Sequence, residues 1–204
     1  MLDTENQYES PQNRALERNP NKDSFWDLVK FVFIAVIIVL PIRMLVAQPF
    51  IVSGSSMFPT FEDNQYLIVD QISYRFEEPS RGDVVIFKYP LDPSKFFIKR
   101  AIGLPNETVT IKSGVITITD TEGNSFTLDE PYLESERASR DTMSIELGED
   151  EYFVMGDNRI ASSDSRTWGV LPRKNMVGKA MIRLLPLDTL ESHPGEFHKY
   201  QIEE

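Results

Sequence analysis

The chain has 204 residues, 41% of them apolar, which is enough for one modest domain with flanking segments. Its formal net charge of −11 argues against a nucleic-acid partner, because phosphate binding depends on clustered Lys and Arg and the 21 basic residues form no such cluster. Cysteine is absent, which excludes thiol catalysis, disulfides and Cys-ligated zinc.

The two histidines, His193 and His198, stand in a polar tail close to the C-terminus. This position argues against a Ser-His-Asp triad and against a His-ligated metal site. We therefore expect neither a cofactor nor a metal ion.

Residues 28–47 form an apolar stretch whose only charges, Lys30 and Arg43, stand near its ends. A bilayer core is crossed by ~20 apolar residues in a helix. With Phe25 and Trp26 as interfacial anchors, the sequence predicts a transmembrane helix over residues 25–47. A buried core helix and a cleaved signal peptide are the alternatives. The second fits poorly, because the stretch is long and its polar leader has 24 residues.

Basic residues are more frequent before this stretch than after it. Four basic residues lie at or before its N-terminal end: Arg14, Arg18, Lys22 and Lys30. At its C-terminal end, Arg43 is the only basic residue over the next 30 residues. The positive-inside rule then predicts a single-pass protein of the cytoplasmic (inner) membrane, with a cytoplasmic N-terminus and the rest of the chain outside the cytoplasm. Residues 1–24 are predicted to be a disordered cytoplasmic tail.

Residues 48–185 carry the pattern of an antiparallel β domain, so we expect a mainly β fold. Short segments rich in Val, Ile, Phe, Tyr and Thr are bounded by Gly, Pro, Asn or Asp. Ser113-Gly114 is typical of a two-residue hairpin turn. The stretch 105–150 is interpreted as an inserted elaboration, and 186–204 as a polar tail. The predicted strands are Gln65–Asp70, Asp83–Tyr89, Lys95–Gly103, Glu107–Lys112, Val115–Thr119, Thr142–Leu147, Glu151–Gly156 and Met176–Leu185.

A serine-rich turn follows the apolar stretch at Ser53–Thr60. Its glycine permits a tight backbone whose amides can converge on an oxyanion. Such a loop is more often structural than catalytic. If it is catalytic, its serine needs a base, and with histidine unsuitable the candidates are a lysine or a carboxylate.

Lys99 is the favoured base because it stands in an apolar strand, on the same face as Phe97 and Ala101. Burial there would lower its pKa. An unshifted lysine is only about one part in a thousand neutral at pH ~7.4, so a base needs a downward shift of roughly 2–3 units. The alternative is that Lys99 reaches solvent from the strand and that Arg100 is the important residue.

Four segments together resemble the successive sequence boxes of bacterial type I signal peptidases, the Ser-Lys dyad family. They occur in the family's order, behind an apolar N-terminal stretch, and the resemblance covers approximately residues 25–185. The segments are Ser56–Thr60, Arg81–Val85, Ile98–Pro105 and Gly156–Arg159, the last followed by Ser162, Asp164, Ser165, Arg166, Trp168 and Gly169.

The resemblance implies a membrane-bound serine endopeptidase that removes signal peptides from exported preproteins by cutting after small residues, in an Ala-x-Ala pattern. It makes Ser56 the nucleophile and Lys99 the general base. It makes Ser162 the serine that orients the lysine, and it gives Asp164 and Arg166 a supporting ion pair. Segments 81–83 and 156–159 are interpreted as turns.

Two positions depart from the family pattern. Gly54 stands where some relatives carry a serine that helps to form the oxyanion hole, so a second donor beside the Ser56 amide must come from elsewhere, a backbone N–H being one candidate. Ile160 stands where an acidic residue is frequent, which leaves the local hydrogen bonding open. Neither departure removes the dyad.

The expected substrate-binding walls are apolar: Ile51, Met57 and Phe97. An apolar cluster after the span is interpreted equally well as a membrane-contacting surface or as core; it contains Phe50, Ile51, Val52, Met57, Phe58 and Phe61. The expected partners are signal-peptide-bearing preproteins and the lipid bilayer, with the protein export machinery a candidate and no nucleic acid. The rival functions are a membrane-tethered β domain that only binds, and a Ser-Lys self-cleaving regulatory protease.

Overall fold

The computed structural model describes residues 20–41, 47–133 and 141–195. The chain divides into two compact units, Met1–Arg43 and Met44–Glu204. The predicted disordered tail over residues 1–24 lies largely outside the described residues, whereas the predicted C-terminal tail over residues 186–204 is described as far as residue 195.

In the first unit, the described residues form the helix α1 (Pro20–Pro41). Large apolar side chains along it are exposed, among them Phe31, Phe33 and Ile38. Within the described ranges, no helix reaches the combination of length and apolarity that a membrane span requires. The span predicted over residues 25–47 also includes residues 42–46, which lie outside the described residues.

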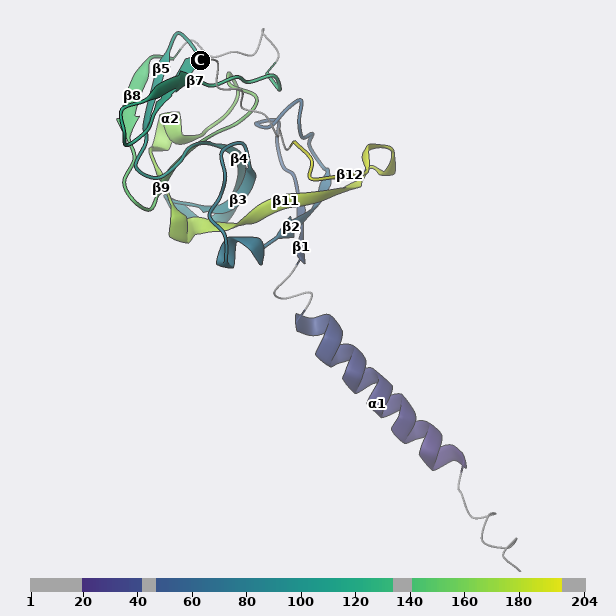
Figure 1. The fold of residues 1–204 in the computed structure, drawn as a ribbon. Coiled ribbons are helices and arrows are strands. Elements are labelled where there is room, and N and C mark those ends of the chain that lie inside the picture. Colours follow the sequence, from purple (N-terminus) through teal and green to yellow (C-terminus); the bar gives the residue numbers. More distant parts are fainter. Residues whose placement is uncertain (1–19, 42–46, 134–140, 196–204) are drawn as a thin grey trace, which may run out of the picture. The chain divides into compact units, whose positions relative to one another are not determined.

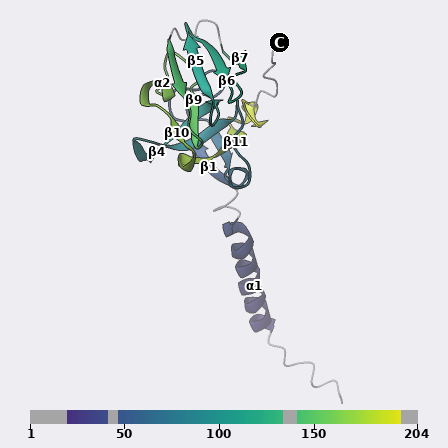
Figure 2. The same cartoon turned by 60° about the vertical axis from the view of Figure 1, so that its left-hand side comes forward.

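The second unit is built on antiparallel β-sheets (Figures 1 and 2). Its larger sheet has the order β1-β2-β11-β3-β4-β9-β10, with β12 paired to β11. All of its strand pairs are antiparallel. The strands are β1 (Ala47–Ile51), β2 (Tyr66–Asp70), β3 (Val84–Tyr89), β4 (Asp92–Gly103), β9 (Glu151–Met155), β10 (Leu171–Pro172), β11 (Met176–Leu185) and β12 (Glu191–Ser192).

A smaller sheet in the order β7-β6-β5-β8 lies within the stretch interpreted as an insertion. Lys112 pairs with Val115 across Ser113 and Gly114, which both have positive φ, at 50° and 86°. The predicted two-residue hairpin is therefore confirmed. The strands are β5 (Thr108–Lys112), β6 (Val115–Thr119), β7 (Ser125–Thr127) and β8 (Met143–Glu146).

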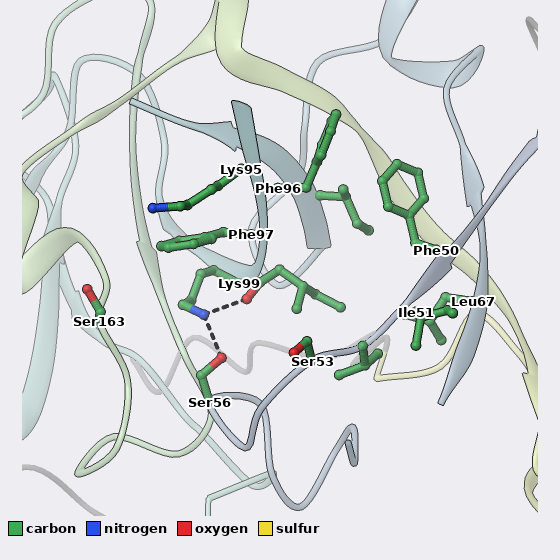
Figure 3. Close-up of a pocket in the computed structure, with 13 residues that line it drawn as sticks. Phe50, Ile51, Ser53, Ser56, Leu67, Lys95, Phe96, Phe97, Lys99 and Ser163 are labelled. Atoms are coloured by element: carbon green, nitrogen blue, oxygen red, sulfur yellow. Dashed lines mark hydrogen bonds between the residues drawn. The ribbon is translucent and has the colours of Figure 1, made fainter. Parts of the chain in front are cut away.

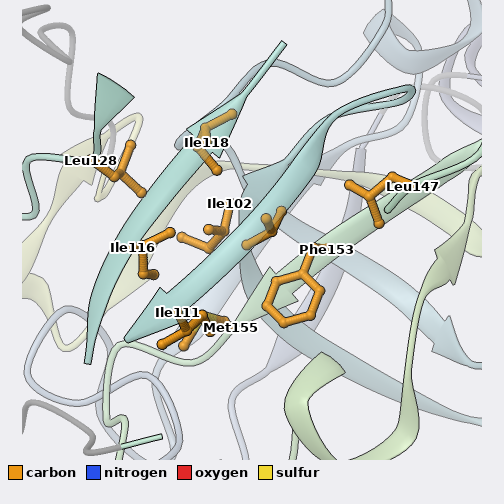
Figure 4. Packing of buried hydrophobic residues seen from close by; sticks show 9 residues of the cluster. Ile102, Ile111, Ile116, Ile118, Leu128, Leu147, Phe153 and Met155 are labelled. Carbon is orange, nitrogen blue, oxygen red and sulfur yellow. The ribbon is translucent and has the colours of Figure 1, made fainter. Parts of the chain in front are cut away.

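Strand β3 is buried on both faces, which explains its unbroken apolar run. Val84 and Ile86 point into one cluster, while Val85 and Phe87 point into another on the opposite face. A third cluster joins the smaller sheet to β4 and β9 (Figure 4). It contains Ile102, Val109, Ile111, Ile116, Ile118, Leu128, Leu147, Phe153 and Met155.

Short helices complete the second unit. They are η3 (Ser73–Arg75), α2 (Ser165–Trp168), η5 (Arg173–Asn175) and η6 (Leu187–Thr189). Asp164 caps α2 by accepting a hydrogen bond from the Arg166 backbone N–H. This cap fixes the loop that follows β9, the strand next to β4.

Candidate active site

Ser56 lies in the turn that connects β1 to β2. Asn158 holds this turn with two hydrogen bonds: its backbone N–H donates to the Ser56 carbonyl at 3.0 Å, and its Nδ2 donates to the Ser55 carbonyl at 3.0 Å. Asn158 follows β9, so a residue about a hundred positions away in the chain fixes the serine turn.

Lys99 comes from β4 and is 4% exposed. Its Nζ lies 2.6 Å from Ser56 Oγ and donates a hydrogen bond to the Ile98 carbonyl at 2.8 Å (Figure 3). The same Nζ is 5.5 Å from the centre of the Phe97 ring. The structure therefore brings together the hydroxyl and the amine that the sequence predicts as nucleophile and base.

Burial is the main influence on the Lys99 amine. It lowers the pKa of Lys99 from 10.5 to about 8, although the negative charges of Asp164 and Asp157 oppose the shift. At that pKa about one amine in five is neutral at pH ~7.4, against about one in a thousand for an ordinary lysine. The alternative of a lysine that reaches solvent does not fit a side chain this deeply buried.

Asp164 and Arg166 form an ion pair beside this site, with the Arg166 Nη2 2.7 Å from Oδ2 of Asp164 and its Nε 2.8 Å from Oδ1. Burial alone would raise the pKa of Asp164, but the hydrogen bonds from Arg166 and from the Gly156 N–H lower it overall. The carboxylate is therefore charged at neutral pH. Arg166 also contacts Asp141 at 2.7 Å.

Ser162 is also close to the serine turn, but its hydroxyl is not bonded to Lys99. Its Oγ is buried and lies close to the Asp164 carboxylate, whose charged form it favours, although the contact falls outside regular hydrogen-bond geometry. A Cβ placed on Gly156 would lie 2.3 Å from this Oγ and 2.3 Å from the Ser56 carbonyl. Ser162, Gly156 and Ser56 are thus packed directly against one another.

A groove of about 440 Å³ opens beside Ser56 and Lys99 (Figure 3). Ile51 and Phe97, two of the three residues expected to wall a substrate pocket, line it. Met57 does not: it is 1% exposed and packs in the core with Val52 and Phe61. The side chain that follows Ser56 is directed inward, so this part of the expected wall is core.

Gly54 lies in the same turn with φ +91°, a backbone conformation that suits glycine. Its N–H donates to Asp63 Oδ1 at 2.7 Å, so it is already occupied. The Ser56 N–H makes no hydrogen bond with the described residues. Ile160 is 68% exposed, and the hydrogen bonds of its neighbour Asn158 are made without it.

Comparison with known proteins connects this geometry to a family. The family described as signal peptidase, peptidase S26, matches residues 25–185. The chain belongs to that family. Signal peptidase I of Leptolyngbya laminosa is 36% identical over 191 residues, covering 89% of this chain and 91% of the relative. Signal peptidase I of Bacillus amyloliquefaciens is 35% identical over 184 residues, covering 85% and 91%.

Among solved structures, the crystal structure of a signal peptidase I from Enterococcus faecalis is 26% identical, with a TM-score of 0.44. It covers 52% of this chain and 98% of that chain. Membership of the signal peptidase family confirms the resemblance inferred from the four sequence boxes, and with it the prediction of a serine endopeptidase that processes signal peptides.

Sequence reasoning missed several groove residues of this family member. Phe50, Ser53 and Phe96 line the groove, and the Ser53 hydroxyl points toward the side where Ser56 lies (Figure 3). The sequence places Ser53 at the start of the serine-rich turn and assigns it no role of its own. The alternation of side chains along β4 puts Phe97 on the same face as Lys99 and gives no sign that Phe96, on the opposite face, reaches the same groove. Phe96 also contacts Phe50, with 5.4 Å between the ring centres, and this contact depends on the tertiary fold.

Proposed function

We propose that this chain cleaves signal peptides from exported preproteins with Ser56 as nucleophile and Lys99 as general base. The observation that supports this most strongly is the 2.6 Å separation of Lys99 Nζ and Ser56 Oγ in a setting that favours the neutral amine. Rate enhancement by a positioned base requires both this distance and a pKa near the working pH.

In the acylation step, neutral Lys99 takes the proton of the Ser56 hydroxyl as Oγ attacks the scissile carbonyl carbon. The tetrahedral intermediate collapses when the C–N bond breaks, and Lys99 returns the proton to the leaving amine. The mature protein departs with a new N-terminus, and the signal peptide stays on Ser56 as an ester. The hydrogen bond from Lys99 to the Ile98 carbonyl directs the amine lone pair away from that carbonyl.

Two donors are proposed for the oxyanion. The first is the N–H of Ser56, which is not engaged elsewhere among the described residues. The second is the hydroxyl of Ser53, which lines the groove, points toward Ser56 and has no hydrogen-bond partner in the described chain (Figure 3). The Gly54 N–H is an unsuitable donor because Asp63 already accepts from it.

In deacylation, Lys99 takes a proton from a water molecule that attacks the ester carbonyl. The ester bond to Ser56 breaks, the serine recovers its proton, and the signal peptide is released with a new carboxylate. The same two donors stabilise the second tetrahedral intermediate, so one geometry serves both steps.

We propose that the groove selects small residues before the cut, in the Ala-x-Ala pattern. Phe97 and Ile51 restrict it with bulky apolar side chains, which leave shallow apolar room beside the reacting groups. Ser162 is proposed to act as a positioning residue that packs against the serine turn through Gly156, with the Asp164–Arg166 pair holding its loop.

The proposed setting is the cytoplasmic membrane, with the catalytic unit outside the cytoplasm. The apolar composition of residues 28–47 supports an anchor there, as do the exposed Phe31, Phe33 and Ile38 of α1. This arrangement would present the groove to a preprotein whose apolar signal segment lies in the same bilayer.

The test is cleavage of a purified preprotein by the full chain in detergent micelles. Ser56→Ala and Lys99→Ala should each abolish turnover while far-UV circular dichroism shows a folded chain. Ser55→Ala and Lys112→Ala are the matched controls and should keep wild-type turnover. Folded Ser56→Ala and Lys99→Ala variants with wild-type turnover would instead support the rival of a β domain that only binds a partner.

A further inference from the structure

A second hollow of about 440 Å³ lies apart from the catalytic pair. Three elements supply its charged wall: η3, β3 and η5, through Arg75, Lys88, Arg173 and Lys174. None of its lining residues is a carboxylate. In a chain with a net charge of −11, four cations around one hollow with no acidic residue form a locally positive site.

Arg173 is held in place, because its Nε lies 2.8 Å from Glu78 Oε2 and its Nη2 donates to the Tyr74 carbonyl at 2.5 Å. The other three cations differ from it. Arg75, Lys88 and Lys174 make no ion pair with any carboxylate in the described ranges. Their charges therefore remain available to a ligand.

The frame of the hollow is ordered by hydrogen bonds. Asn175 Nδ2 donates to the Lys88 carbonyl at 3.0 Å, which ties η5 to β3. Asp70 Oδ1 accepts from the N–H groups of Ile72 and Ser73, which fixes the start of η3. The three cations without an ion pair consequently lie on backbone segments that hydrogen bonds hold in place.

Gln71 adds an unsatisfied hydrogen-bond donor at the edge of the hollow. It lines the same hollow, and its Nε2 is buried without a hydrogen-bond partner in the part of the chain that the structure describes. Buried amide donors are rarely left unsatisfied, because removing them from water without a partner is costly. Gln71 is half-buried, so rotation of its side chain would carry this donor into the hollow, where an anionic oxygen would satisfy it.

We propose that this hollow binds a phosphate group, with Arg75, Lys88 and Lys174 neutralising its charge and Gln71 Nε2 donating to one of its oxygens. A phosphate group fits several converging donors because it offers three or more acceptor oxygens. Phe96 lines both this hollow and the catalytic groove, so the bound anion would lie next to the β4 residues that form the groove wall. The phosphate could belong to a lipid headgroup or be free in solution.

The test uses the full chain in maltoside micelles with two probes, inorganic phosphate and dihexanoyl phosphatidylglycerol, and sodium chloride of equal ionic strength as reference. Each probe that binds should raise the thermal unfolding midpoint in a saturable way. In the variant Lys88→Gln/Lys174→Gln the half-saturating concentration should rise about tenfold, from the loss of two exposed charge pairs. Lys112→Gln, an exposed strand lysine elsewhere, should leave it unchanged, and Lys88→Arg should largely preserve binding.

The two probes separate the sources of the ligand. A response to the lipid alone identifies a headgroup site, a response to inorganic phosphate alone identifies a site for free phosphate, and a response to both shows that the phosphate group suffices. The proposal is overturned if neither probe gives a saturable response beyond that of chloride, or if the double variant binds as tightly as the wild-type chain.

Discussion

Arg100 and Asp157 form a fully buried ion pair immediately next to Lys99 in β4. Arg100 Nε lies 2.9 Å from Asp157 Oδ1, and its Nη2 lies 2.6 Å from Oδ2. Both side chains are 0% exposed. Thr60, from the turn that carries Ser56, donates to Asp157 at 2.5 Å. One carboxylate thus links β4, the segment after β9 and the serine turn.

Removing that carboxylate should destabilise the whole second unit. In Asp157→Ala the buried Arg100 guanidinium would lose both of its hydrogen bonds to this carboxylate, and breaking a buried ion pair costs about 3–5 kcal/mol. We expect a loss of this size in the free energy of unfolding, measured by urea titration of the full chain in micelles. Glu149→Ala is the control, because this exposed carboxylate should change stability by less than ~0.5 kcal/mol. Equal stability of the two variants would contradict a structural role for the pair.

Gly156 is predicted to be intolerant of a side chain. An alanine Cβ would meet the Ser56 carbonyl and the Ser162 hydroxyl at 2.3 Å, so the serine turn would have to move. A displacement of about 1 Å can cost 100-fold in rate, so Gly156→Ala should lower kcat by about that factor. Overpacking should also cost about 1–3 kcal/mol of stability.

The matched control for this change is Gly148→Ala. Its added Cβ meets only the flexible Glu151 carboxyl end, at 3.2 Å. Steady-state cleavage of a peptide substrate should separate the two variants. If Gly156→Ala cleaves as fast as Gly148→Ala, the close packing around the serine turn does not position the nucleophile.

Ser53 is expected to contribute to the transition state and not to substrate binding. Loss of one oxyanion donor typically costs about 100-fold or more in kcat. Ser53→Ala should therefore lower kcat by about this factor and leave KM nearly unchanged. Ser55→Ala, the exposed neighbour outside the groove, should behave as wild type. A Ser53→Ala variant with normal kcat would contradict the role of the Ser53 hydroxyl as the second oxyanion donor.

Asp164 is expected to influence the pH profile through Lys99. Its negative charge favours the protonated amine and so raises the pKa of Lys99 against the larger effect of burial. In Asp164→Asn the acid limb of kcat/KM should therefore move to lower pH. Asp141→Asn changes the exposed end of the same Arg166 network and should leave the limb in place. A limb that moved upward in Asp164→Asn would contradict this assignment.

Most of the β framework follows from local sequence. All eight predicted strands are present as β2, β3, β4, β5, β6, β8, β9 and β11, because their β-branched and aromatic residues match a pleated, buried surface. The strand β1 was missed because Ala47–Ile51 contains a proline and adjoins the predicted span; it is an edge strand, where proline is tolerated. The strands β7, β10 and β12 have three residues or fewer, too few for a period.

The contacts within the site could not be predicted from local sequence. A buried lysine in an apolar strand could be expected from residues 96–103, but its contact with a serine 43 positions earlier depends on how the sheet folds. Met57 illustrates the converse. Its place next to Ser56 suggests a pocket wall, whereas the turn directs it into the core. Of the apolar cluster after the span, Val52 and Phe61 are also core, while Ile51 is 56% exposed.

The most direct test of the account is a titration of the Lys99 amine in the full chain, by NMR of lysines labelled with ¹³C at Cε. The Lys99 resonance would be assigned by its absence in Lys99→Arg. The account predicts a midpoint of about 8, so that a useful fraction of the amine is neutral at the working pH. A midpoint at the ordinary value of 10.5 would mean that Lys99 is protonated throughout that range and would contradict its role as the base for Ser56.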